Sequence, residues 1–134
     1  MKKALAIAAL LVTAFAGSAT AADKYDVKVN APAAKAKAKG VAKISITPKG
    51  KYHMNTDYPA KLSLSGSDGL TVEKAKQTKA DAAKFDQSAA EFQVSYTSAS
   101  PGKKSITGEL KFAVCADSEC VPSTEKISID VDVK

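Results

Sequence analysis

From residue 41 onward, apolar and polar residues alternate along most of the chain, which is the pattern of β-strands with one buried face. The segments with this alternation are 41–46, 60–64, 70–72, 92–96, 106–114 and 127–133. Turn-forming residues separate several of them, at 48–50, 65–69 and 100–102. Six or seven short strands divided by such turns predict an antiparallel β-sandwich, in which each sheet buries one face and exposes the other.

One stretch, from Thr78 to Ala90, breaks the alternation because it is rich in Ala, Lys and Asp. We expect a turn or two of helix around residues 79–85. Its position between strand patterns predicts a connection between the two sheets rather than a functional helix.

The first 21 residues have the three parts of a secretory signal peptide. Lys2 and Lys3 precede an apolar run over residues 4–16, and Ala19-Thr20-Ala21 provides a small-residue cleavage site. The apolar run is shorter than the ~20 residues that span a bilayer, so no stable membrane insertion is expected. We therefore predict a periplasmic or secreted protein after the signal peptide is cleaved.

Residues 22–40 are expected to form an N-terminal segment in front of a sandwich domain at 41–134. A short strand is predicted at 25–29, followed by residues 31–40, which contain only Ala, Lys, Pro and Gly. The lysines repel one another, and no large apolar side chain is available to offset the entropy of ordering this stretch. We expect a flexible arm, and we expect truncation before Gly40 to leave the fold intact.

Composition and charge disfavour several classes of function. The 134 residues include twenty lysines, no arginine and one histidine, with a formal net charge of +6. A single histidine, His53, cannot build a multi-histidine metal centre, and no Gly-rich phosphate loop is present. Because export is predicted and the guanidinium groups that clamp phosphates and guanine edges are missing, no nucleic-acid partner is expected. No cofactor is expected either.

Both cysteines lie in residues 112–122, with four residues between Cys115 and Cys120 and a strand pattern on either side. If residues 116–119 form a hairpin loop, Cys115 lies directly opposite Cys120. Directly opposed Cα atoms in an antiparallel pair are ~4.5–5.5 Å apart, which falls within the usual disulfide range. A disulfide can therefore form without moving the backbone.

The parity of the apolar positions predicts which way the sulfur atoms face. In this register two apolar rows share one face and must be buried: Ile106, Leu110, Phe112 and Val114 on the first strand, and Val121, Ile127, Ile129, Val131 and Val133 on the second. Both cysteines then lie on the solvent side, together with Lys111, Pro122 and Lys126. Glu125 points inward, and a β-bulge near Pro122 is the simplest way to relieve this.

Two roles for the disulfide remain open on the residues alone. A structural cross-link is the commoner role in exported proteins, and it would suit a non-catalytic envelope protein that binds a partner or supports structure. A loop this short, however, contributes only about 2 kcal/mol, and the chain is long enough to build its own core. A solvent-facing disulfide is also open to attack by a thiolate, which would suit thiol–disulfide exchange.

The string Cys115-Ala-Asp-Ser-Glu-Cys120-Val-Pro122, followed by a long alternating strand, resembles the active-site hairpin in the N-terminal domain of the thiol:disulfide interchange protein DsbD family. Residues 50–55 are similar to an early strand of that family. The resemblance implies an immunoglobulin-like sandwich over most of residues 40–134 and a protein-disulfide oxidoreductase activity. It also implies a thioredoxin-like or other envelope redox partner, with Cys120 entering the mixed disulfide and Cys115 resolving it.

The chain departs from that family at three points. The loop between the cysteines is one residue shorter than in DsbD itself, and Ser123 stands where a second proline is usual. We also expect neither a transmembrane electron-carrying domain nor a thioredoxin-like domain within these 134 residues. We therefore expect any exchange of electrons to occur in trans.

Tyr52, His53, Asp117 and Pro122 are the predicted supporting residues around the cysteines. His53 either flanks the redox site or is a half-buried strand histidine; a metal site shared with the cysteines is a minor alternative, because zinc usually takes three or four protein ligands. Soft Cu(I) would suit the thiolates and the neighbouring Met54, but parity directs Met54 and His53 to opposite faces.

The charged residues around the cysteines have opposing effects on thiol pKa. Asp117 and Glu119 would raise it, and Lys111 and Lys126 would lower it. Solvated turn residues are the alternative for the two acids. The reduction potential and the direction of electron flow are therefore not fixed by the sequence.

Overall fold

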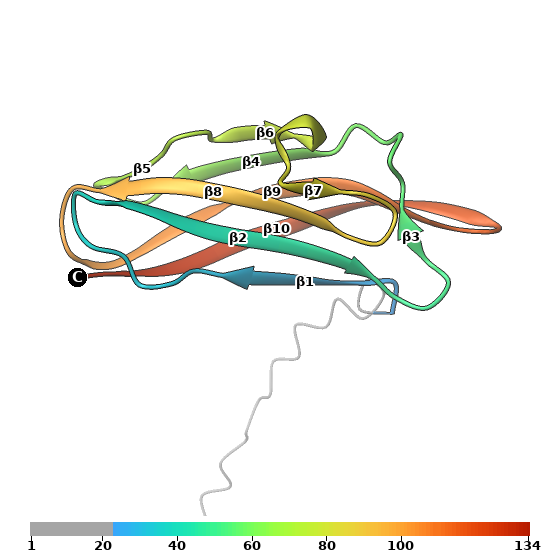
Figure 1. The fold of residues 1–134 in the computed structure, drawn as a ribbon, viewed down its shortest axis with the longest axis horizontal. Helices are drawn as coiled ribbons and strands as arrows, with labels where there is room; N and C mark the ends of the chain where they lie inside the picture. Colours follow the sequence, from blue (N-terminus) through green and yellow to red (C-terminus); the bar gives the residue numbers. More distant parts are fainter. Residues whose placement is uncertain (1–22) are drawn as a thin grey trace, which may run out of the picture.

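The computed structural model describes residues 23–134 as two antiparallel β-sheets packed face to face (Figure 1). The predicted signal peptide lies outside the described residues. The elements are β1 (Tyr25–Asn30), β2 (Lys39–Pro48), β3 (His53–Met54), β4 (Lys61–Gly66), β5 (Leu70–Val72), β6 (Lys76–Thr78), the 3₁₀ turn η1 (Lys79–Asp81), β7 (Lys84–Phe85), β8 (Ala90–Ser98), β9 (Gly102–Ala116) and β10 (Glu119–Val133).

The strand order confirms the predicted immunoglobulin-like antiparallel β-sandwich. One sheet has the order β1-β2-β8-β5, with β7 also paired to β8, and the other has the order β10-β9-β4-β6, with β3 also paired to β9. Taken in chain order, β1, β2, β4, β5, β8, β9 and β10 occupy the positions of strands A to G in the ABED and CFG sheets of an immunoglobulin domain. Strand β6 is an addition at the edge beside β4.

The core lies between the sheets and consists of the inward residues that the alternation predicted. Its largest fully buried side chains are Tyr96, Phe92, Phe112, Ile44, Ile46, Met54, Leu62, Ile106, Leu110, Ile129, Val94 and Val114. At one edge of this core, the ring of Tyr25 meets Phe112 edge-on, with 4.8 Å between the ring centroids. Residue 25 therefore belongs to the domain, whose first strand precedes the predicted boundary at residue 41.

The segment that connects the sheets contains less helix than the sequence suggested. Only the 3₁₀ turn η1 forms, and the Asp81 carboxylate accepts a hydrogen bond from the Thr78 N–H (2.9 Å) at its start. Two residues separate η1 from β7, which pairs with β8. There the ring of Phe85 packs edge-on against the ring of Phe92 in β8. Pairing with β8 thus ends the helix, and the segment joins the two sheets as expected.

The short strand predicted at 25–29 is confirmed as β1, but residues 34–37 are not part of a flexible arm, contrary to what the composition of residues 31–40 suggested. Strand β1 pairs with β2 along its whole length. Further on, the Ala34 N–H donates to the Asp132 carbonyl (3.0 Å), the Ala36 N–H to Lys134 (2.9 Å), and the Lys37 N–H to Ser98 (2.7 Å). The expectation was wrong because it counted only side chains that could be buried, whereas backbone groups pair whatever the side chain is.

Candidate disulfide site

The β9–β10 hairpin carries both cysteines near its tip, which projects beyond most of the other strands (Figure 1). Its register is unbroken from Glu119 opposite Ala116 to Val133 opposite Gly102, and it places Cys120 opposite Cys115 as predicted. The turn itself is shorter than the expected loop, since only Asp117 and Ser118 lie outside the ladder.

A disulfide joins Cys115 to Cys120, with a Cα–Cα distance of 4.0 Å. The two cysteines differ in exposure: Cys115 is only 6% exposed, whereas Cys120 is exposed. The register confirms the predicted outer face for both cysteines, but the prediction that Cys115 is exposed there is wrong. The reason is position in the sheet, because β9 has neighbours on both sides at this point while β10 is an edge strand.

The neighbour that helps to cover Cys115 is β3, a strand of two residues. His53 lies directly opposite Cys115, and Met54 lies opposite Val114. Directly opposed residues share a face of the sheet, so His53, Cys115 and Cys120 form one row on the outer face, while Met54 is buried in the core. The predicted opposite orientation of His53 and Met54 is thereby confirmed.

An open hollow of about 380 Å³ surrounds this row. It is lined by His53, Met54, Asn55, Thr56, Asp57, Gln87, Cys115, Ala116 and Cys120. Residues 55–57 and Gln87 were not anticipated. They come from loops that carry no periodic pattern, and they reach the site through backbone contacts: the Met54 N–H donates to the Gln87 carbonyl (2.9 Å) and the Asn55 N–H to the Ala113 carbonyl (2.9 Å).

Tyr52 supports the tip of the hairpin from the opposite face. Its hydroxyl donates a hydrogen bond to the carboxylate of Glu119, and the Lys24 ammonium lies 5.8 Å from the centroid of its ring. The hydrogen bond lowers the pKa of Glu119, with help from Lys24 and Lys51, and raises the pKa of Tyr52. By parity Glu119 faces away from the sulfur atoms, so its charge is directed to these partners rather than to the cysteines.

Pro122 lies within the ladder, opposite Ala113, and no bulge interrupts β10 there. The predicted bulge is therefore wrong. Proline is tolerated because β10 is an edge strand, where a missing N–H on the open side removes no ladder bond.

Glu125 is accommodated without a bulge by the hydroxyl of Tyr25, which donates a hydrogen bond to its carboxylate. Asp117, in the turn, is exposed, as are Lys111 and Lys126 on the outer face.

Two further properties of the described residues concern metal binding and membrane-spanning helices. Within residues 23–134, no three or more His, Cys, Asp or Glu side chains are grouped so that they could hold a metal ion. No helix in the same range is long and apolar enough to cross a membrane.

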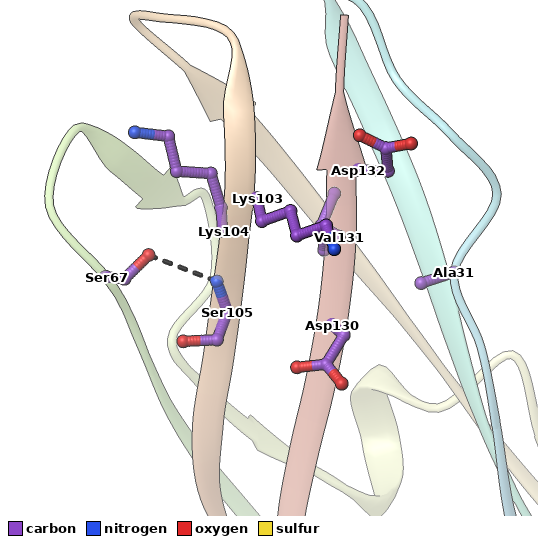
Figure 2. Close-up of a pocket in the computed structure, with 8 residues that line it drawn as sticks. All are labelled: Ala31, Ser67, Lys103, Lys104, Ser105, Asp130, Val131 and Asp132. Atoms are coloured by element: carbon purple, nitrogen blue, oxygen red, sulfur yellow. Dashed lines mark hydrogen bonds between the residues drawn. The ribbon is translucent and has the colours of Figure 1, made fainter.

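A second hollow, of about 560 Å³, lies toward the other end of the β9–β10 hairpin (Figure 2). Its lining combines basic, acidic, hydroxyl and apolar residues: Ala31, Ser67, Lys103, Lys104, Ser105, Asp130, Val131 and Asp132. The Lys104 ammonium already donates to the Asp68 carbonyl and the Ser100 hydroxyl, at 3.2 Å each. No cysteine or histidine lines it, so the disulfide row remains the main candidate site.

Comparison with known proteins places the chain in no established family. No protein-family model and no curated protein matches it. Among solved structures it is similar to AggA, the major subunit of aggregative adherence fimbriae type I from Escherichia coli, with 11% identity over 82% of this chain and 95% of that chain and a TM-score of 0.42. Similarity at this level says nothing about function. The intrachain disulfide itself is typical of exported proteins.

Proposed function

We propose that this protein is a periplasmic or secreted thiol:disulfide exchange module that transfers electrons through the Cys115–Cys120 disulfide. The observation that carries the proposal is the asymmetry of the bond: Cys120 is exposed at the tip of an edge hairpin, whereas Cys115 is buried beside His53. One sulfur is thus open to an incoming thiolate and the other is shielded. The resemblance of the cysteine hairpin to that of the DsbD family supports the same assignment.

In this exchange a thiolate of a thioredoxin-like partner attacks the Sγ of Cys120. A mixed disulfide forms between the partner and Cys120, the Cys115–Cys120 bond breaks, and Cys115 leaves as a thiolate. A second thiol of the partner then attacks the mixed disulfide, which leaves this protein reduced by two electrons and the partner oxidised. In the reverse direction, the Cys120 thiolate attacks an oxidised partner and Cys115 resolves the mixed disulfide.

The test uses two single-cysteine variants offered to an oxidised thioredoxin-like protein. Cys115→Ser should trap a covalent complex through Cys120, because the resolving thiol is missing. Cys120→Ser should trap much less, since the remaining sulfur of Cys115 is buried. A complex seen only with Cys120→Ser would reverse the roles of the two sulfur atoms. Failure of both variants, together with a wild-type disulfide that resists millimolar glutathione, would rule out exchange.

A second candidate is a non-catalytic envelope sandwich in which the disulfide is a structural cross-link. The burial of Cys115 and the unbroken ladder around the bond favour it, because both limit access to the disulfide. The reduction potential separates the two candidates. Structural disulfides typically lie below about −300 mV, whereas those that exchange lie higher.

A further inference from the structure

Strand β10 has one open side. It pairs with β9 along its whole length, but the backbone groups on its other side bond another described segment only at the far end, through residues 34–36. Between Cys120 and Asp130, the structure of residues 23–134 contains no backbone hydrogen bond on that side. The exposed cysteine thus lies on a length of edge strand whose outward backbone groups lack a partner.

The bonds at the far end identify which backbone groups face outward. The Asp132 carbonyl accepts the Ala34 N–H at 3.0 Å from the open side. Because the register of β10 is unbroken, every second residue back to Cys120 has the same orientation. Cys120 and Thr124 therefore present both an N–H and a carbonyl to the open side. Pro122 has the same orientation, so its carbonyl faces the open side. Its missing N–H would also have faced the open side, and the proline therefore removes no hydrogen bond to β9.

The direction of the disulfide determines where an attacking thiolate must come from. Displacement at a disulfide sulfur is in line, so the incoming sulfur approaches opposite the sulfur that leaves. With Cys115 on β9 as the leaving group, the incoming sulfur approaches Cys120 from the side away from Cys115. An approach from the open edge of the sheet meets this requirement.

We propose that an exchange partner whose cysteine lies in an extended segment docks that segment as an added strand, antiparallel to β10, along this open edge, an inference that rests on the proposed exchange function. A residue placed directly opposite Cys120 on such a strand shares its face of the sheet. A partner cysteine there extends the row of His53, Cys115 and Cys120, which puts its sulfur on the side of Cys120 away from Cys115. Added strands bind mainly through backbone hydrogen bonds, so the partner is recognised by its extended conformation more than by its sequence.

The chain itself already pairs a segment with this edge, in the parallel direction. Residues 34–36 lie along the far end of β10, where the Ala34 carbonyl also accepts the N–H of Lys134 (2.8 Å) and the Ala36 N–H donates to the Lys134 carbonyl (2.9 Å). An added strand at the other end would continue a pairing surface that the fold already contains. The exposed turn of the hairpin leaves room for the segment to enter.

The test compares nine-residue peptides, each with a central cysteine flanked by alternating Thr and Val, as reductants of the full-length wild-type disulfide. One peptide is unmodified, one carries N-methyl groups two residues before and after its cysteine, and a matched control carries them one residue before and after. In a strand antiparallel to β10 with its cysteine opposite Cys120, only the first pair of methyl groups lies on residues whose N–H groups face β10, and the residue two before the cysteine would otherwise donate to the Pro122 carbonyl. We expect the unmodified and control peptides to react about fivefold faster than the blocked peptide, since one backbone hydrogen bond to β10 is lost; the residue two after the cysteine lies opposite Ser118, in the turn.

Variants of the protein provide the second arm. Thr124→Pro removes an outward N–H and should abolish most of the advantage of the unmodified peptide, whereas Ser128→Pro, which lies beyond the reach of the peptide, should not. Dithiothreitol, which needs no strand pairing, should reduce all three proteins at similar rates. In the Cys115→Ser mixed disulfide with the unmodified peptide, the Thr124 amide should become protected from hydrogen exchange.

The two proposals fail in different ways. If dithiothreitol reduces the disulfide but all three peptides react equally fast, exchange stands and edge docking is overturned. If neither dithiothreitol nor any peptide reduces the folded protein, the exchange function fails and edge docking fails with it.

Discussion

The hydroxyl of Tyr25 in β1 donates a hydrogen bond to the carboxylate of Glu125 in β10, one hundred residues later in the chain. The two strands are the edges of opposite sheets, so this bond closes one side of the sandwich. It also explains why an inward-pointing glutamate is tolerated without a bulge. Burial, followed by the bond to Glu125, raises the pKa of Tyr25 to about 12.

Tyr25→Phe should lower the free energy of unfolding at pH 7 by about 1–2 kcal/mol, because it leaves Glu125 without its donor. The folded pKa is raised, so the stabilisation is complete below about pH 10 and is lost as pH rises from about 10 to about 12. The variant should therefore lose less stability than wild type across that window. Urea unfolding at pH 7 and pH 11 checks this, with Tyr58→Phe as a control. Equal losses in Tyr25→Phe and wild type would contradict the assignment.

A chain that begins at Gly40 should be much less stable than one that begins at residue 22, contrary to what the composition of residues 31–40 suggested. The truncation removes β1, the buried ring of Tyr25 and the backbone bonds of residues 34–37. Loss of a buried aromatic side chain alone costs about 3–5 kcal/mol. Thermal unfolding of both chains provides the measurement, and equal midpoints would mean that the observed pairing of β1 adds no stability.

Reduction of the disulfide should leave the sandwich folded. The bond closes a short loop and contributes about 2 kcal/mol, while β9 and β10 remain paired over the rest of their length. Far-ultraviolet circular dichroism at 25 °C should therefore keep its β-sheet spectrum after reduction, with a lower unfolding midpoint. Complete unfolding on reduction would instead identify the disulfide as a necessary structural cross-link.

Gly108→Ala should destabilise the protein by about 3 kcal/mol, because a Cβ atom there would lie 1.8 Å from the Ser63 carbonyl oxygen of β4 and would force the two strands apart. Gly50→Ala is the matched control. Its φ of +59° makes alanine unfavourable by about 1 kcal/mol, but no atom lies within 4 Å of the added Cβ. Chemical unfolding of both variants should rank Gly108→Ala as clearly the more damaging, and the reverse order would contradict the close approach of β4 and β9.

Much of the site could be predicted because it depends on local pattern. The alternation in β9 and β10 requires their apolar rows to share one face, and with a short loop that requirement fixes Cys115 opposite Cys120. The same alternation defined the strands of the sandwich and most of its core. These features follow from the sequence alone because burial on one face of a strand repeats every two residues, whatever the strand pairs with.

The exposure of each cysteine was decided only by the tertiary structure. Parity assigned both sulfur atoms to the same face, but β3 pairs beside Cys115 while nothing pairs beside Cys120 among the described residues. The order of residues 34–37 was decided in the same way, by backbone bonds to the ends of β8 and β10. Such contacts join backbone groups that every residue carries, between segments far apart in the chain. No pattern of side chains predicts these backbone contacts. Only the assembled sheets determine which edges are covered and which remain open.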